Sequence, residues 1–296
     1  MNGLRRQRTL ERPAVVSGFG YWSGRDVRVE FRPAPADSGV VFVRSDLGPQ
    51  ARIPALVKHR VESPRRTNLR VGSASVEMIE HIMAALSGLQ IDNCEVWVDA
   101  PEMPGLDGSA QPFVEALDEA GVVTLDAPRM QIRVRETIRV GDDNCWLEAR
   151  PAPRAGWSAG GMTLKFRIDY PEQRAIGRQT IGVSVSPESF RRELAPCRTF
   201  ALKQEADWLR AQGLGKRVTT DHLLIYDEHG PIDNELRFTD ECVRHKALDL
   251  VGDLALGGCD VVGHFVAQCS GHRLNAELVK VLLVEGELIG ARRKSA

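Results

Sequence analysis

Apolar and polar residues alternate in two separate parts of the chain, one in each half. In the first half, residues 27–31 alternate and the apolar run 41–43 follows. In the second half, residues 132–140 and 164–170 show the same alternation. A period of two residues is typical of strands that bury one face. The pattern therefore predicts a sheet in each half, with one face packed against another layer.

A predicted helix follows these strands in each half, and a glycine and a further strand follow the helix. In the first half, residues 76–86 carry an apolar stripe at helical spacing and lead through Gly88 into a predicted strand at 93–98. In the second half, residues 243–253 lead through two glycines into a predicted strand at 260–266. The two halves thus follow one plan.

The repeated order predicts an α+β fold of two similar layered sandwich domains, with their helices packed face to face. The expected first domain covers residues 1–126 and closes after a helix at 112–121, and the expected second domain covers 127–296. A length of 296 residues suits one large or two medium domains. Side chains from the two helix layers would meet at the domain interface.

Composition narrows the class of protein. Hydrophobic residues make up 43% and charged residues 27%, as in soluble globular proteins, and a net charge of −1 gives no general attraction for nucleic acid. No apolar run reaches the roughly 20 residues that span a bilayer, and the first ten residues lack the apolar core of a signal peptide. Six cysteines without a CxxC pair indicate a reducing compartment. We expect a cytoplasmic protein, and a monomer.

The helix predicted at 243–253 carries the most informative chemistry. His245, Asp249 and Asp253 recur every four residues and would lie along one helix face. A histidine and an aspartate one turn apart are a ready pair of zinc ligands, and the apolar residues around them would partly bury the stripe. Most isolated pairs of this kind are surface hydrogen-bonded pairs, so metal binding needs support from elsewhere in the chain.

Two other segments give that support. Glu80 and His81 are adjacent near the edge of the apolar stripe in the first helix, where His81 would be a third ligand and Glu80 a general base for water. His272 follows a glycine between a predicted strand end and a helix predicted at 276–283, a common place for a catalytic side chain. Taken alone, the first is more often a boundary pair and the second a loop histidine.

The chain resembles the UDP-3-O-acyl-N-acetylglucosamine deacetylase family, the zinc amidases of lipid A biosynthesis. The three segments above carry the resemblance together with Leu106-Asp107-Gly108-Ser109-Ala110 and Cys197-Arg198-Thr199-Phe200. It extends from Gln7 to about Leu283, nearly the whole chain. It implies the two-domain fold, an acylated UDP-amino-sugar as substrate, and hydrolysis of its N-acetyl group with release of acetate.

The resemblance also implies a role for each matching residue. Zinc would be held by His81, His245 and Asp249, with the fourth position left open for catalysis. Glu80 would deprotonate water, and His272 would act as a cation that stabilises the oxyanion and protonates the leaving nitrogen. The remaining residues would assist: Asp253 holds His272, Thr199 donates to the oxyanion, and Lys246 and Phe200 contact substrate.

The chain departs from the family pattern at positions expected to line the substrate. Trp22 stands where the family usually has a histidine, and the stretches 65–69 and 213–220 differ from their usual versions. The second stretch lies in a β-α-β insert at about 199–227, with its helix at 205–212, which the resemblance implies to form an acyl-chain passage. These departures leave the hydrolytic residues complete but bear on substrate choice.

Two alternatives stay open at this point. Trp22 and the altered insert suit a paralogue that deacetylates a different N-acylated amino sugar. A non-catalytic protein that binds a glycolipid or nucleotide sugar is the third hypothesis, although no catalytic residue is missing from the sequence.

Overall fold

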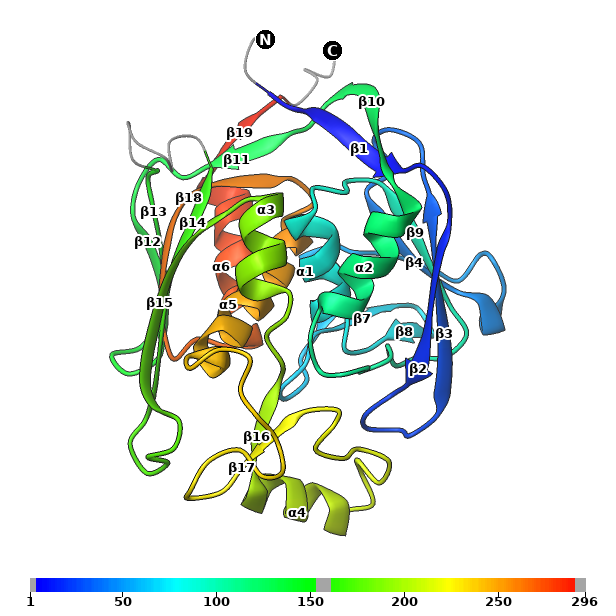
Figure 1. Cartoon of the computed structure of the whole chain (residues 1–296). Helices are drawn as coiled ribbons and strands as arrows, with labels where there is room; N and C mark the ends of the chain where they lie inside the picture. Colours follow the sequence, from blue (N-terminus) through cyan, green and yellow to red (C-terminus); the bar gives the residue numbers. More distant parts are fainter. Residues whose placement is uncertain (1–3, 153–160, 291–296) are drawn as a thin grey trace.

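The computed structural model describes residues 4–152 and 161–290. Two sheets form the outer layers of the molecule, and the helices lie between them (Figure 1). The extreme ends of the two expected domains, 1–3 and 291–296, fall outside the described residues.

The sheet of the first half has five strands in the order β2-β3-β9-β4-β5. Their bounds are β2 Ala14–Phe19, β3 Asp26–Pro33, β4 Val40–Arg44, β5 Arg52–Pro54 and β9 Cys94–Val98. Helix α1 (Glu80–Gly88) precedes β9, and α2 (Gln111–Ala120) follows it. A small sheet of β6 (Arg60–Val61), β7 (Asn68–Val71) and β8 (Ala74–Val76) leads into α1.

The second half has a larger sheet around β18. Its strands are β11 Gln131–Arg133, β12 Ile138–Gly141, β13 Trp146–Arg150, β14 Met162–Tyr170, β15 Gly177–Val185, β18 Asp260–Gln268 and β19 Glu287–Ile289. Helix α5 (Glu241–Leu254) precedes β18, and α6 (His272–Glu285) follows it.

Strand pairing repeats between the halves. Strand β9, which follows α1, and strand β18, which follows α5, occupy equivalent places. Each pairs antiparallel on one side (β3–β9, β13–β18) and parallel on the other (β4–β9, β14–β18). Each of these neighbours continues into an antiparallel outer strand, β2 and β5 in the first half and β12 and β15 in the second. The predicted α+β fold of two similar layered halves is confirmed.

The predicted first helix differs from the structure in its start and in its surroundings. The helix begins at Glu80, because residues 74–76 form β8 and Met78 has a left-handed φ of 57°. Burial extends beyond the predicted apolar stripe, since every residue of α1 except Ser87 is buried. Layers on all sides enclose this helix, so its pattern reflects a core helix more than a surface one.

Helices α1 and α5 pack directly against each other between the sheets (Figure 1). Gly252 of α5 lies so near α1 that a β-carbon at this position would overlap the backbone carbonyl oxygen of Glu80. Glycine therefore permits the close approach of the two backbones, and the approach brings the polar residues of both helices within reach of each other.

The remaining elements close the two ends of the molecule. Strand β1 (Arg6–Leu10) pairs antiparallel with β10 (Val122–Pro128), which runs through the expected domain boundary. The insert consists of β16 (Phe200–Leu202), α4 (Lys203–Ala211) and β17 (Leu224–Tyr226), and lies at the opposite end from β1 (Figure 1). Short helical segments complete the chain: Ser45–Leu47, Val57–His59, α3 (Pro187–Ser189), the π-turn Phe190–Leu194 and Ala255–Gly257.

A four-residue ion network joins the halves beyond the carboxyl end of α1. Arg5 donates to Asp92 at 2.7 Å and to Asp260 at 2.6 and 2.7 Å. Arg129 lies 2.9 Å from the same Asp92 carboxylate and 3.3 Å from that of Asp260. The network connects the start of the chain, both halves and the segment between them.

In the part of the chain that the structure describes, no helix has the length and apolar character needed to cross a membrane.

Candidate metal centre

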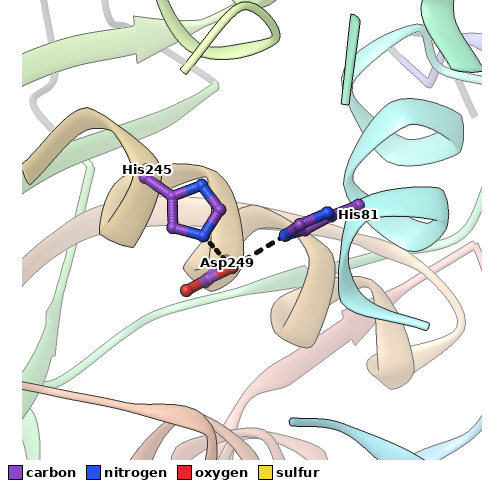
Figure 2. Close-up of side chains that lie close together, drawn as sticks. All are labelled: His81, His245 and Asp249. Atoms are coloured by element: carbon purple, nitrogen blue, oxygen red, sulfur yellow. Dashed lines mark ion pairs between the residues drawn. The ribbon is translucent and has the colours of Figure 1, made fainter. Parts of the chain in front are cut away.

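Three buried side chains from the two central helices point toward one another (Figure 2). His81 is the second residue of α1, whereas His245 and Asp249 lie one turn apart on α5. Oδ1 of Asp249 lies 3.4 Å from Nε2 of His245 and 3.8 Å from Nε2 of His81. The helix pairing therefore brings together residues that are more than 160 positions apart in the sequence.

These donor atoms fit a metal ion. Atoms that bind a tetrahedral zinc ion at about 2.0–2.2 Å lie about 3.3–3.6 Å from one another, close to the distances seen here. Among the described residues, Oδ1 of Asp249 is a buried oxygen without a hydrogen-bond partner, a state that a cation would relieve. Two imidazoles and one carboxylate oxygen are a typical ligand set for a catalytic ion, because they leave positions open.

The protonation states of His81 and His245 also fit a metal ion at this site. Burial, with the nearby ring of His245, lowers the pKa of His81 to about 3, and burial also lowers the pKa of His245. Nδ1 of His245 lies 3.1 Å from the carbonyl oxygen of Cys197. Since a carbonyl only accepts, this contact places the proton on Nδ1 and leaves the Nε2 lone pair free. Both rings thus present a neutral nitrogen to the site.

Lys246 forms an ion pair with the second carboxylate oxygen of Asp249. Its Nζ lies 2.8 Å from Oδ2 of Asp249, and its side chain also lines the adjoining cavity. Burial alone would raise the pKa of Asp249, but the neighbouring His245, Lys246 and His272 outweigh burial and hold this pKa well below its ordinary value. The carboxylate is therefore charged, with one oxygen paired and the other available.

Glu80 stands beside His81 at the start of α1 and is fully enclosed. Its Oε2 accepts the backbone N–H of Thr67 at 2.9 Å. Burial raises the pKa of Glu80 to about 7, while the opposing charge of His272 acts to lower it. A carboxyl group with a pKa near neutrality is suited to proton transfer.

His272 is the first residue of α6, so the expectation that it lies in a loop before a later helix is wrong. The helix starts at residue 272 because Gly271 is extended and the turn that follows is already helical. Nδ1 of His272 lies 2.8 Å from Oδ2 of Asp253. Burial by itself would lower the pKa of His272, but the charges of Asp253, Asp249 and Glu80 outweigh it and raise the pKa to about 9. The ring is a cation near neutral pH.

A cavity opens beside these groups and continues toward the insert. It is lined at one end by Glu80, His81, His245, Asp249 and His272, and next to them by Thr199, Phe200 and Lys246. Farther on, the wall is mostly apolar and comes largely from the insert: Ala201, Ala206, Leu209, Leu214, Val218, Leu223 and Ile225. Asp253 does not line the cavity and contacts it only through His272.

The positions that depart from the family pattern divide into two groups. Trp22, Arg65 and Gly215 line the cavity, as expected. Thr67 does not: it is completely buried, and its hydroxyl contacts Asp253 at 2.6 Å and Nδ1 of His272 at 3.2 Å. Arg66, Asn68 and Leu69 do not line the cavity either, so the expectation that the whole stretch 65–69 faces substrate is wrong for residues 66–69.

Thr67 and Asn275 are the contributors to this site that sequence reasoning missed. Asn275 donates its amide to Oδ2 of Asp253 at 2.8 Å. Its position three residues after His272 is a usable signal, because residues at i and i+3 share a helix face. Thr67 gives no comparable signal, since its partners are 186 and 205 residues away.

Comparisons with known proteins agree with this geometry. The family model described as UDP-3-O-acyl N-acetylglycosamine deacetylase matches residues 7–284. Curated proteins named UDP-3-O-acyl-N-acetylglucosamine deacetylase from Brucella ovis, Brucella abortus and Brucella melitensis are each 41% identical to the chain over 279 residues. The similarity covers 94% of this chain and 95% of each relative. With a match of this extent, and with His81, His245 and Asp249 brought together in the structure, the chain belongs to the UDP-3-O-acyl N-acetylglycosamine deacetylase family.

Proposed function

We propose that this protein is a zinc-dependent amidohydrolase that removes the N-acetyl group of UDP-3-O-acyl-N-acetylglucosamine and releases acetate, in lipid A biosynthesis. The observation that carries the proposal is the meeting of His81, His245 and Asp249 beside Glu80 at one end of a single cavity. The relatives with 41% identity carry the name of this activity.

His81, His245 and Asp249 would hold the ion. When bound, zinc would supply Lewis-acid polarisation of the amide carbonyl and would make water more acidic. Glu80 would accept the proton of the attacking water, a role for which its raised pKa and its position beside His81 are suited. Oδ1 of Asp249 is the oxygen available to the ion, because Lys246 already pairs with Oδ2.

His272 would act on the other side of the reacting carbon. As a cation it would stabilise negative charge on the carbonyl oxygen, and it would then donate its Nε2 proton to the departing sugar nitrogen. Asp253, which accepts a hydrogen bond from Asn275, contacts Nδ1 of the ring and leaves Nε2 directed toward the site. Thr199 would donate its hydroxyl to the developing oxyanion from the cavity wall.

The cavity suits an amphiphilic substrate. Its apolar part, formed by the insert, would take the acyl chain, while Lys246 and Phe200 lie where the head group would meet the metal end. The Lys246 Nζ lies 5.8 Å from the centre of the Phe200 ring. We also infer a division into domains near residue 126, a monomer, and a cytosolic location. The six free thiols support the last of these.

Metal analysis combined with acetate release from the named substrate tests the proposal. We expect about one zinc ion per chain and, for Glu80→Gln or His272→Gln, a turnover about 10²–10⁴-fold lower with the zinc retained. Glu148→Gln is a matched control, because Glu148 is a buried carboxylate on β13 whose partner is Arg150, outside the site. A wild-type protein that binds zinc but releases no acetate would reject the proposed activity.

One observation favours a second candidate, a deacetylase of a different N-acylated amino sugar. Trp22 lines the cavity and stacks under the guanidinium of Arg66, 4.4 Å from the ring centre, where the family usually has a histidine. Rates on nucleotide sugars with and without the 3-O-acyl chain separate the two candidates. A strong preference for the acylated sugar supports the first, and equal rates support the second.

A further inference from the structure

Thr67 forms polar contacts with residues on both sides of the proposed reaction centre. Its backbone N–H donates to Glu80, and its hydroxyl contacts Asp253 and His272. Its side chain is fully buried behind the cavity and does not line it. The contacts of its hydroxyl also connect the two halves. Thr67 precedes β7 of the first half, whereas Asp253 and His272 belong to α5 and α6 of the second half.

We propose that Thr67 is a positioning residue for both proton-transfer groups of the site. Its N–H orients the Glu80 carboxylate, and its hydroxyl orients the imidazole of His272 through Asp253. The inference rests on the proposed function, since it assigns Thr67 to the same reaction.

The hydrogen-bond geometry assigns each proton. A carboxylate only accepts, so the single hydroxyl proton of Thr67 goes to Oδ1 of Asp253, at 2.6 Å. The lone pairs of the hydroxyl then face Nδ1 of His272, at 3.2 Å, and can only accept from it. The Nδ1 proton is shared between this hydroxyl and Oδ2 of Asp253, at 2.8 Å. Thr67 therefore favours the ring form that carries a proton on Nδ1 and directs Nε2 into the site.

The same arrangement satisfies Asp253 completely. Thr67 serves its Oδ1, while His272 and Asn275 serve its Oδ2. Removing the hydroxyl leaves Oδ1 buried without a donor, and such an oxygen draws the carboxylate toward another partner. The ring of His272 would follow Asp253, because their contact is the shortest polar contact of the ring.

Two substitutions of Thr67 separate the effect of losing the hydroxyl group from the effect of changing the volume of the side chain. Thr67→Val keeps the volume and the backbone N–H to Glu80 but removes the hydroxyl. Thr67→Ser keeps the hydroxyl and removes only a methyl group. We expect kcat of Thr67→Val to fall about 10–100-fold with KM and zinc content unchanged, as is typical when a partner of an active-site group is lost. Thr67→Ser should return kcat to within about threefold of the wild type.

Thr163→Val is the matched control. Thr163 is also buried, and its hydroxyl lies 2.8 Å from Nδ1 of His264, so the substitution removes a threonine–histidine contact outside the site. We expect this variant to lose thermal stability and to keep its kcat.

A readout that does not depend on turnover completes the experiment. In the zinc-loaded protein with 15N-labelled histidine at neutral pH, both ring nitrogens of His272 should show the resonances of a protonated ring, with a hydrogen-bonded Nδ1 proton, in the wild type and in Thr67→Ser. Thr67→Val should shift these resonances, and Thr163→Val should not. This measurement tests Thr67 even if the wild type fails to release acetate, so failure of the proposed function and failure of this inference are distinguishable.

Three results would overturn the inference: unchanged kcat in Thr67→Val, a loss of kcat that matches a loss of zinc, or a Thr67→Ser variant as slow as Thr67→Val. If Thr67→Val does not fold, Thr67→Ser and the ring resonances of its His272 still decide, because a displaced ring in a protein that retains the hydroxyl contradicts the assigned role.

Discussion

The two halves of the molecule share one strand order but contribute different chemistry. In each, a helix precedes the strand that pairs both parallel and antiparallel, and a second helix follows it. The first half supplies Glu80 and His81 from the opening turn of α1. The second half supplies His245, Asp249 and Asp253 from α5 and His272 from the start of α6.

The difference follows from helix length and from what each second helix carries. Helix α5 has 14 residues, enough to place three polar groups on one face over two turns, whereas α1 has nine and uses only its first turn. Helix α6 begins with an imidazole, while α2 begins with Gln111 and Pro112 and places no titratable group at its start. A repeated fold thus repeats positions in space, and the residues that occupy those positions can diverge.

The largest expected effect comes from separating the metal ligands of the two halves. His81→Ala and His245→Ala should each weaken zinc binding at least about 100-fold and abolish measurable turnover, because each removes a donor that the other half cannot replace. Zinc titration of the purified variants measures this. If one variant kept wild-type affinity, the ion would belong to one half alone and the comparison would fail. His264→Ala, a histidine of β18 outside the triad, is the control.

A smaller effect is expected from the contact between the helices. Gly252→Ala places a methyl group against the carbonyl oxygen of Glu80, so α1 and α5 must move apart. We expect a loss of about 1–3 kcal/mol in the free energy of unfolding, the usual cost of overpacking, together with weaker zinc binding. Denaturant unfolding of the metal-free protein and zinc titration measure the two effects. Gly182→Ala on β15, where no atom lies near the added carbon, is the control. Equal behaviour of the two variants would contradict a tight helix contact.

We expect the pH dependence of turnover to reflect the pKa values of two groups, Glu80 from the first half and His272 from the second. In the proposed mechanism Glu80 acts as a carboxylate, so activity should rise as pH increases through its pKa of about 7, or through a lower pKa where a bound cation opposes protonation. In the same mechanism His272 acts as a cation, so activity should fall as pH increases through its pKa of about 9. Outside the plateau, each limb should change about tenfold per pH unit. His272→Gln should remove the alkaline limb from the residual activity. An alkaline limb that persists in this variant would assign it to another group.

The smallest expected effect concerns the insert. Arg65 of the first half, which lines the cavity, pairs with Glu205 of α4 at 2.7 Å, and both side chains are partly exposed to solvent. Because exposed ion pairs contribute about 0–1 kcal/mol, Arg65→Ala should change the unfolding free energy by no more than this. A rise in KM without a change in kcat would show that the pair matters for binding substrate. Arg192→Ala, which removes an exposed pair with Glu188 far from the cavity, provides the reference.

The local sequence pattern was sufficient to predict those parts of the site that lie within one helix or strand. The spacing of His245 and Asp249 predicted a shared helix face, and the alternation at 27–31 and 164–170 predicted strands that the structure contains. The position of Glu80 beside His81 needed only their adjacency. These features depend on helix and strand periods, which the sequence displays directly.

Features that depend on packing between segments far apart in the chain could not be predicted from local sequence patterns. Thr67 reaches its partners only because β7 lies beside the start of α1 and near α6, and no local period indicates that neighbourhood. The left-handed Met78 ended the preceding segment where an apolar pattern suggested helix. The early start of α6 at His272 was missed because Gly271 offers no side-chain cap to mark it.

The ion network around Arg5 has a practical consequence for anyone who shortens the protein. Asp92 and Asp260 approach the same guanidinium groups, and Arg5 donates four hydrogen bonds to these two carboxylates. A version trimmed past this arginine would leave two carboxylates facing each other with Arg129 as their remaining counter-ion. Recombinant boundaries should therefore begin upstream of it, even though the residue stands far from any chemistry.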